Sequence, residues 1–121
     1  LPFCYVRSSA KSHGLNNTVE GNLKSDETVF VIEDLISSGM SSLKAVEDIR
    51  KHGNTVVSLG AIFTYGFDKA SNNFKSANCE YHTLTNYNQL IEIAVSKNYI
   101  SSNEIGNLKE WRENPSIWKQ Q

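Results

Sequence analysis

The sequence lacks the features that mark secreted, membrane-spanning or nucleic-acid-coating proteins. Its two cysteines, Cys4 and Cys79, lie far apart and form no CxxC pair, which argues against a disulfide-stapled scaffold and favours the reducing cytoplasm. No apolar run approaches the roughly 18 residues of a membrane-spanning helix, and no basic-then-apolar leader precedes the first apolar segment. The formal net charge of -1 gives no signature of nucleic-acid binding. We therefore expect a cytoplasmic protein without a nucleic-acid or membrane partner.

Two common phosphate-binding loops are also absent. The chain contains neither GxxxxGKS/T nor GxGxxG, which removes the main support for a kinase or a dehydrogenase. It has no internal repeat or linker, and its 121 residues match the usual size of one domain. Because the chain begins at Leu1 rather than Met and runs directly into an apolar segment, we expect a single domain, residues 1–121, that is a fragment of a longer protein.

The N-terminal part contains two strand-like segments with a polar segment between them. Residues 3–7 predict a short buried strand. Residues 8–26 are polar and rich in Gly and Asn, which predicts a long mobile loop of the kind that often serves as a functional lid. Residues 28–32 form a continuous β-branched and aromatic run, which is typical of a strand buried on both faces of a parallel sheet.

The segments that follow predict an α/β fold with a parallel sheet of three to four strands. Leu43, Val46 and Ile49 recur at helical spacing until Gly53, and the β-rich run 55–63 then completes a βαβ unit. Further elements are expected at 71–77 (a short helix), 80–84 (a short strand) and 87–97 (an amphipathic helix).

The C-terminal part, residues 86–121, is predicted to be helical. Asn86 and Ser101 are each followed three residues later by Gln or Glu. This is the spacing of a capping box, in which two side chains bind the free N–H groups at a helix start. We therefore expect one helix to begin after each of these residues.

Residues 33–42 lie where a parallel strand is expected to end and a helix to begin. Ligands of parallel α/β sheets bind beyond the carboxyl ends of the strands. The unpaired N–H groups of a Ser- and Gly-rich loop and the positive end of a helix dipole suit a phosphate. The preceding carboxylates, Glu33 and Asp34, suit sugar hydroxyls and a Mg²⁺ ion that the phosphates also ligate. The segment predicts a phosphorylated-sugar site; the alternative is an ordinary turn of an α/β domain.

The order of residue types here resembles the signature of type I phosphoribosyltransferases. Residues 29–41 read VFVIEDLISSGMS: an apolar strand, two acids, two apolar residues and a small hydroxylated loop with a glycine. The resemblance implies a site for 5-phosphoribosyl 1-diphosphate (PRPP), with Asp34 preferred for the ribose hydroxyls and the loop for the 5′-phosphate. The PRPP-binding residues implied in this segment are Glu33, Asp34, Leu35, Ile36, Ser37, Ser38, Gly39, Met40 and Ser41.

The polar segment upstream narrows the resemblance to orotate phosphoribosyltransferases. Residues 5–14 read YVRSSAKSHG, which is similar to the catalytic loop of that family, and Arg7, Lys11 and His13 match its basic positions. Ser8 stands where some members carry a second basic residue that contacts the diphosphate. Similarity to the bacterial branch continues at residues 60–67, 73–74 and 82–87. An orotate-contacting Arg that other branches place after the later strand is absent here.

The resemblance implies transfer of ribose 5-phosphate from PRPP to orotate, giving orotidine 5′-phosphate and diphosphate in pyrimidine (UMP) synthesis. Arg7 and Lys11 would neutralise the departing diphosphate together with Mg²⁺, and His13 would hydrogen-bond it or donate a proton. The catalytic loop would span residues 7–21, and Ser37 would contact orotate. The expected catalytic residues are Lys11, His13 and Asp34. Mg²⁺ is the expected cofactor, held through the substrate with the acidic pair beside it.

Two other functions stay open. One is a purine-salvage phosphoribosyltransferase, against which the Arg-x-x-x-Lys-x-His loop argues; the other is a regulatory module that senses PRPP without catalysis. The resemblance also implies a homodimer whose loop reaches the neighbouring active site. In the family an N-terminal region contributes the orotate pocket, a further diphosphate-binding loop and a strand. Nothing before Leu1 corresponds to it, so we expect the chain alone to show little turnover.

Overall fold

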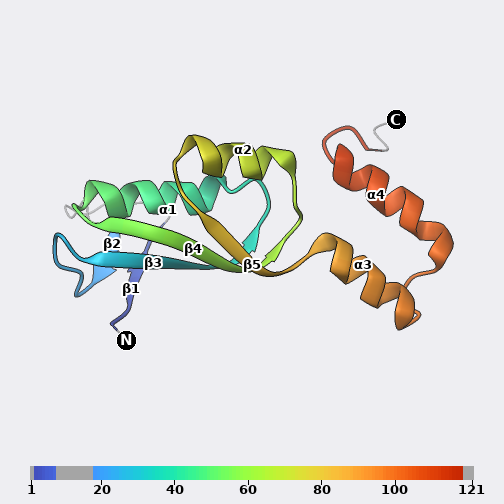
Figure 1. The fold of residues 1–121 in the computed structure, drawn as a ribbon, viewed down its shortest axis with the longest axis horizontal. Coiled ribbons are helices and arrows are strands. Elements are labelled where there is room, and N and C mark those ends of the chain that lie inside the picture. Colours follow the sequence, from blue (N-terminus) through green and yellow to red (C-terminus); the bar gives the residue numbers. More distant parts are fainter. Residues whose placement is uncertain (1, 8–17, 119–121) are drawn as a thin grey trace.

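A three-stranded parallel sheet forms the centre of the protein. The computed structural model describes residues 2–7 and 18–118. The sheet has the order β3-β4-β5 and consists of β3 (Thr28–Ile36), β4 (Thr55–Thr64) and β5 (Tyr81–Asn86). The helices α1 (Met40–Lys51) and α2 (Asp68–Ser76) connect these strands and lie on the same face of the sheet (Figure 1). The predicted α/β fold with parallel strands is confirmed.

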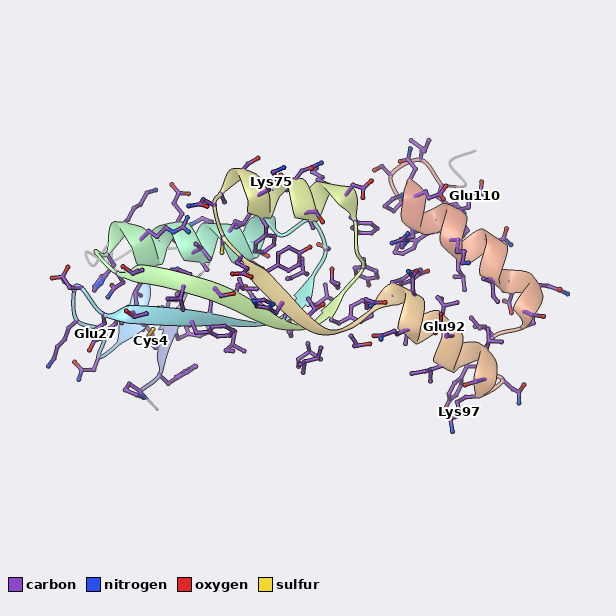
Figure 2. All side chains as sticks on the ribbon, in the orientation of Figure 1. Cys4, Glu27, Lys75, Glu92, Lys97 and Glu110 are labelled. Atoms are coloured by element: carbon purple, nitrogen blue, oxygen red, sulfur yellow. The ribbon has the colours of Figure 1, made fainter. Side chains whose placement is uncertain are left out.

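The main core lies between this face of the sheet and the two helices. Val46 and Ile49 of α1, which predicted the helix by their spacing, are at most 2% exposed, as are Leu59 of β4 and Phe74 of α2. Side chains fill the space between the helices and the sheet (Figure 2). The helical period of three to four residues places apolar side chains of each helix on one stripe, which explains why one layer of helices suffices for this face.

Strand β3 differs from its prediction in both length and burial. Its ladder with β4 continues through the pairs Leu35–Phe63 and Ile36–Thr64, so the strand does not end at residue 32. Its inner and outer side chains alternate: Val31 is buried, whereas Ile32 is 74% exposed. The prediction of burial on both faces is wrong for this chain, because both connecting helices lie on one face and leave apolar side chains exposed on the other.

The N-terminal residues form a hairpin outside the main sheet. β1 (Cys4–Val6) pairs antiparallel with β2 (Val19–Gly21) as a separate two-stranded sheet. Val19 is buried in the core, but Tyr5 is 59% exposed, so the predicted strand exists without being buried. The prediction of a loop over 8–26 is wrong at β2, which is too short to show a periodic pattern.

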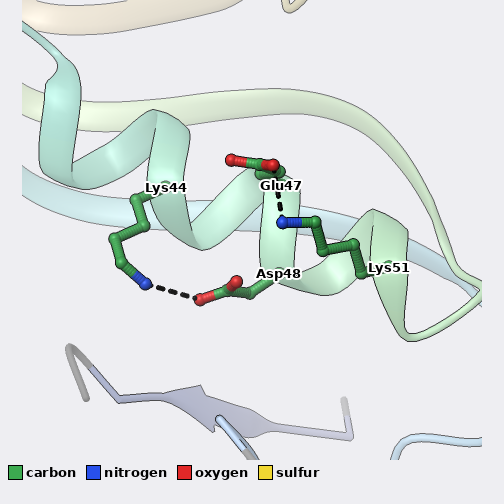
Figure 3. Close-up of polar contacts among 4 residues, drawn as sticks. All are labelled: Lys44, Glu47, Asp48 and Lys51. Atoms are coloured by element: carbon green, nitrogen blue, oxygen red, sulfur yellow. Dashed lines mark hydrogen bonds and ion pairs between the residues drawn. The ribbon is translucent and has the colours of Figure 1, made fainter.

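The outer side of α1 carries two ion pairs at i,i+4 spacing. Lys44 Nζ lies 3.2 Å from Asp48 Oδ2, and Lys51 Nζ lies 2.6 Å from Glu47 Oε1 (Figure 3). The hydrogen bond and charge of Glu47 raise the pKa of Lys51 above its ordinary value. The Lys51–Glu47 pair is exposed to water and contributes little to stability, whereas the Asp48 side chain of the other pair is only 14% exposed. Both pairs keep the outer face of α1 polar.

The C-terminal helices extend away from the sheet (Figure 1). They are α3 (Tyr87–Ser96), the short 3-10 helix η1 (Ser102–Glu104) and α4 (Ile105–Glu113). Asn86 Oδ1 accepts the N–H of Gln89 at 3.1 Å, and Ser101 forms a complete capping box with Glu104. Both predicted helix starts are confirmed, although the second begins with a 3-10 turn. None of the described helices is both long and apolar enough to cross a membrane.

Candidate functional site

The predicted phosphate site lies at the carboxyl end of β3. Residues 33–36, which were predicted to belong to a binding loop over 33–42, are part of the strand, because Leu35 and Ile36 continue the ladder with β4. Only residues 37–39 form the loop itself, and Met40 already begins α1. The backbone N–H of Tyr65, just after β4, donates to the Ile36 carbonyl at 3.2 Å. The loop is therefore held from both sides by regular structure.

Gly39 gives the loop its shape. Its φ is 76°, in the left-handed region that glycine adopts at little cost. A Cβ added there would lie 2.5 Å from Cε2 of Phe74, a ring that is 1% exposed. Glycine is thus required twice, by the backbone conformation and by the close approach of α2.

The N terminus of α1 offers free hydrogen-bond donors. The first bond of the helix runs from the N–H of Leu43 to the carbonyl of Gly39 at 2.9 Å, so the N–H groups of residues 40–42 have no partner within the helix. No side chain caps this end and no acidic residue lies in the first turn. An anion at this place would receive those donors and the positive end of the helix dipole.

The two acids occupy the last part of β3. Asp34 is exposed and Glu33 is half-buried, and Asp34 Oδ1 accepts the N–H of its neighbour Leu35 at 2.7 Å. Within residues 2–7 and 18–118, neither carboxylate takes part in an ion pair. No described cation compensates their charges, and the free donors of α1 follow them in the chain. Carboxylates suit the hydroxyls of a ligand, and the donors suit a phosphate.

Of the basic residues predicted for the catalytic loop, Arg7 is the one that lies within the described residues. Lys11 and His13 lie outside the described residues. Arg7 follows β1, and its Nε lies 2.9 Å from Oε1 of Glu20 on β2. In Figure 1 this hairpin lies near the amino-terminal half of β3, whereas residues 37–39 lie at the carboxyl end. Glu33, Asp34 and residues 37–41 follow one another along the chain at this end of β3, whereas Arg7 lies with the hairpin, apart from them.

An aromatic cluster joins the carboxyl end of β4 to the C-terminal helices. The ring of Tyr65 stacks on Phe67 at 5.4 Å between centroids and contacts Tyr87 at 5.8 Å and Trp111 at 5.6 Å. Burial raises the pKa of the Tyr87 hydroxyl, with the nearby Tyr65 adding to the shift. The cluster holds the residues just after β4, next to the loop over residues 37–39. The sequence pattern did not show this role.

A separate hollow of about 540 Å³ lies between α3 and α4. It is lined by Glu92 and Glu113 as well as by Lys109 and Arg112. Its charges are balanced, so they select no anion or cation. We do not place the site there.

The sequence also missed the residues of α2 that support the phosphate loop. The side-chain amide of Asn73 donates to the carbonyl of Ser38 at 2.9 Å, and Phe74 lies against Gly39. Ala70 and Phe74 stand four residues apart and are both buried. That spacing signals which face of the helix packs inward, but it does not show that Asn73, on the border of this face, reaches the loop.

Comparison with known proteins identifies relatives by sequence. No protein-family model matches the chain. An orotate phosphoribosyltransferase of Listeria innocua is 51% identical over 118 residues, which are 98% of this chain and 56% of that protein. The chain thus spans little more than half the length of such relatives.

Solved structures agree in fold. The crystal structure of orotate phosphoribosyltransferase from Aeropyrum pernix matches with a TM-score of 0.65 at 25% identity, over 83% of this chain and 54% of that one. The Mycobacterium tuberculosis orotate phosphoribosyltransferase in complex with PRPP matches with a TM-score of 0.60 at 25% identity, over 70% of this chain and 47% of that one.

Proposed function

We propose that the chain belongs to the orotate phosphoribosyltransferase family, in which it matches a C-terminal portion, and that it carries the PRPP-binding part of such an enzyme. The enzyme transfers ribose 5-phosphate from PRPP to orotate in the synthesis of UMP. One observation carries this proposal: two carboxylates near the end of β3, without an ion pair among the described residues, precede the uncapped N terminus of α1 along the chain. The M. tuberculosis relative of similar fold was solved with PRPP, which supports the choice of ligand.

PRPP would bind through its 5′-phosphate to backbone N–H groups and through its ribose hydroxyls to carboxylates. The 5′-phosphate accepts hydrogen bonds from the N–H groups of residues 37–41, where the helix dipole favours negative charge. The ribose hydroxyls donate to Asp34 and Glu33, which have no competing cation among the described residues. Ser37, the first loop residue and exposed, contacts orotate. The exposed Met40 contributes through its backbone N–H, because its side chain has no hydroxyl.

The chemistry requires cations at the leaving group. A bond forms between a ring nitrogen of orotate and the anomeric carbon, while the bond from that carbon to the diphosphate oxygen breaks and its electron pair leaves with diphosphate. The ring-nitrogen proton passes to solvent or to the diphosphate. Positive charge from Arg7 and Lys11 stabilises the departing oxygens, and His13 hydrogen-bonds them or donates a proton. The catalytic loop predicted over residues 7–21 would be shortened by β2 (Val19–Gly21), and closure of the part between Arg7 and β2 over the site would exclude water and suppress hydrolysis of PRPP.

Mg²⁺ fits this site only together with the substrate. No group of three or more His, Cys, Asp or Glu side chains within residues 2–7 and 18–118 is arranged to hold a metal ion. Mg²⁺ commonly keeps several waters and binds through one or two carboxylates plus substrate phosphates, and Asp34 and Glu33 supply that number. The ion would neutralise charge on the diphosphate.

The position of Arg7 supports a homodimer. Arg7 lies with the hairpin near the amino-terminal half of β3 (Figure 1) and pairs with Glu20. The proposed site lies at the carboxyl end of β3, so the loop that follows Arg7 has to act away from this hairpin to contact a diphosphate. We propose that it serves the site of a second copy of the chain. We also propose that the enzyme works in the cytoplasm, where its two free cysteines stay reduced.

Calorimetric titration with PRPP and Mg²⁺ tests the site. We expect the chain to bind, and Asp34→Asn to weaken binding about 10- to 100-fold, because hydrogen bonds to a charged group contribute about 1.5–3 kcal/mol. Asp26→Asn is the matched control, since Asp26 is an exposed residue before β3, at the far end of that strand. It should bind like the unsubstituted chain. Equal binding by Asp34→Asn would contradict the proposal.

The choice of base is tested by adding orotate or purines to the same titration. Orotate should strengthen PRPP binding or be converted, and purines should do neither. If no variant binds PRPP, the titration is repeated on a protein extended to the length of the relatives, and failure there would refute the site. The chain alone should show little turnover, so rapid formation of orotidine 5′-phosphate by it would contradict our view that it lacks part of the active site.

A further inference from the structure

We propose that Asn73 on α2 is a positioning residue for PRPP: its side-chain amide sets the orientation of the peptide between Ser38 and Gly39 and so turns an N–H group, rather than a carbonyl, toward the 5′-phosphate. The inference rests on the proposed function, since it names a group that prepares the same loop for its ligand.

The side-chain nitrogen of Asn73 makes two contacts, one with the loop over residues 37–39 and one with the first residue of α1. Nδ2 lies 2.9 Å from the carbonyl oxygen of Ser38, 35 residues earlier in the chain, and 3.5 Å from the sulfur of Met40. An amide nitrogen has two N–H groups, so one can serve the carbonyl and the other the thioether. Met40 thereby takes part in the contact that holds the loop.

The planar peptide bond carries this orientation to the other side of the loop. In a trans peptide the C=O and the following N–H point in opposite directions, and the chain has no cis peptide among its described residues. The Ser38 carbonyl points to Asn73 on α2. The N–H of Gly39 therefore points away from α2, and it joins the free donors at the N terminus of α1.

The loop needs such a contact because its backbone is otherwise permissive. Glycine adopts both signs of φ readily, so the peptide before Gly39 can rotate and exchange the positions of its C=O and N–H. Phe74, the next residue of α2, blocks any Cβ at Gly39 but makes no hydrogen bond to the peptide. Among the described residues, the Ser38 carbonyl has Asn73 as its one recorded hydrogen-bond partner.

A rotated peptide would change the charge that the ligand meets. The partial negative charge of a carbonyl oxygen would replace the partial positive charge of an N–H beside a phosphate. Hydrogen bonds between N–H groups and an ionised phosphate are about twice as strong as neutral ones. Loss of the Asn73 contact should therefore weaken phosphate binding much more than it weakens the fold.

The test uses Asn73→Leu and Asn73→Asp, which remove the donor by different means at similar size. Ribose 5-phosphate is titrated into each ¹⁵N-labelled chain while the Gly39 amide signal is followed by NMR, and unfolding temperatures are measured in parallel. Asn72→Leu is the matched control, because Asn72 is the exposed neighbour on the same helix. Using two substitutions keeps the test available if one variant does not fold.

We expect both Asn73 variants to bind ribose 5-phosphate about 10-fold more weakly, with a shifted Gly39 amide signal before ligand is added. The Asn72→Leu control should match the unsubstituted chain in both respects. Unchanged binding and an unchanged Gly39 signal in folded Asn73 variants would overturn the inference and leave the proposed function standing. Failure of the unsubstituted chain, and then of a protein extended to the length of the relatives, to bind either ribose 5-phosphate or PRPP with Mg²⁺ would overturn the proposed function and the inference with it.

Discussion

The two faces of the parallel sheet differ sharply in how far their apolar side chains are buried. The face under α1 and α2 buries Val31, Leu59 and Ala61, none of them more than 8% exposed. On the opposite face Ile32, Ile62 and other apolar side chains are exposed. The same strands therefore border a buried core on one side and expose an apolar surface on the other. We call these the covered face and the open face.

The comparison explains why the pattern of β3 was misleading. A run without polar alternation is typical of a strand buried on both faces, and such a strand needs two covering layers. The described residues provide one. The relatives are longer than this chain, which spans 56% of the L. innocua protein. In the described residues the run of β3 therefore has apolar side chains on both faces but a covering layer on only one of them.

The largest contrast is expected between Leu59 and Ile62 on β4. Leu59 is fully buried on the covered face, and Ile62 is 58% exposed on the open face. Leu59→Ala should lower the free energy of unfolding by about 2–5 kcal/mol, because it removes buried methyl groups and leaves a cavity. Ile62→Ala should cost less than about 1 kcal/mol, because little area leaves water at that place. Urea denaturation of both variants measures the difference, and equal losses would show that the open face is covered in solution.

Two glycines provide a second, smaller contrast. A Cβ at Gly39 would meet the buried ring of Phe74 at 2.5 Å, and a Cβ at Gly60 would meet the ring of Phe30 at 2.9 Å. Phe74 cannot move, and Gly39 also has a positive φ, so Gly39→Ala should cost about 2–4 kcal/mol from strain and overpacking. Phe30 is 49% exposed on the open face and can turn away.

Gly60→Ala should therefore change the unfolding free energy by less than about 1 kcal/mol. Thermal unfolding of the two variants, compared with the unsubstituted chain, measures both effects. A large loss in Gly60→Ala would mean that Phe30 is held in place by contacts on the open face, and the distinction between the faces would fail there.

Much of the fold was predictable because local patterns determine it. The helical spacing of Val46 and Ile49, and the capping residue Asn86, were enough to place α1 and the start of α3. Strand limits were less predictable, since β3 ends where its ladder with β4 ends and that partner is not visible in the local sequence. β2 was not predicted for a related reason: its partner β1 lies on the other side of a long polar segment of the sequence.

The candidate site was predictable in composition but not in geometry. The order of acids, serines and glycine pointed to residues 33–41, whose role as a binding site stays a prediction; the structure shows that they form the end of β3, a short loop and the start of α1. The sequence did not show that Asn73 holds the loop, because that contact spans 35 residues and depends on how α2 packs. Nor did it show the pairing of Arg7 with Glu20. The roles proposed for Lys11 and His13 stay predictions.

The smallest expected effect concerns a thiol in the core of the covered side. Burial raises the pKa of Cys79 above its ordinary value of 9.0, and the nearby positive charge of Arg50 opposes that shift in part. As pH rises through about 9, the unfolded chain loses the Cys79 proton before the folded chain does, so the unfolded state binds fewer protons and stability falls. This contribution to stability is complete below the unfolded pKa and is lost above it.

Unfolding temperatures measured between about pH 8 and 9.5 should decline less steeply for Cys79→Ala than for the unsubstituted chain. Cys4→Ala, which changes a half-buried cysteine of the hairpin, should leave the slope unchanged. An identical slope in all three proteins would show that the Cys79 thiol meets water as freely in the folded chain as in the unfolded one, which would contradict its place in the covered core.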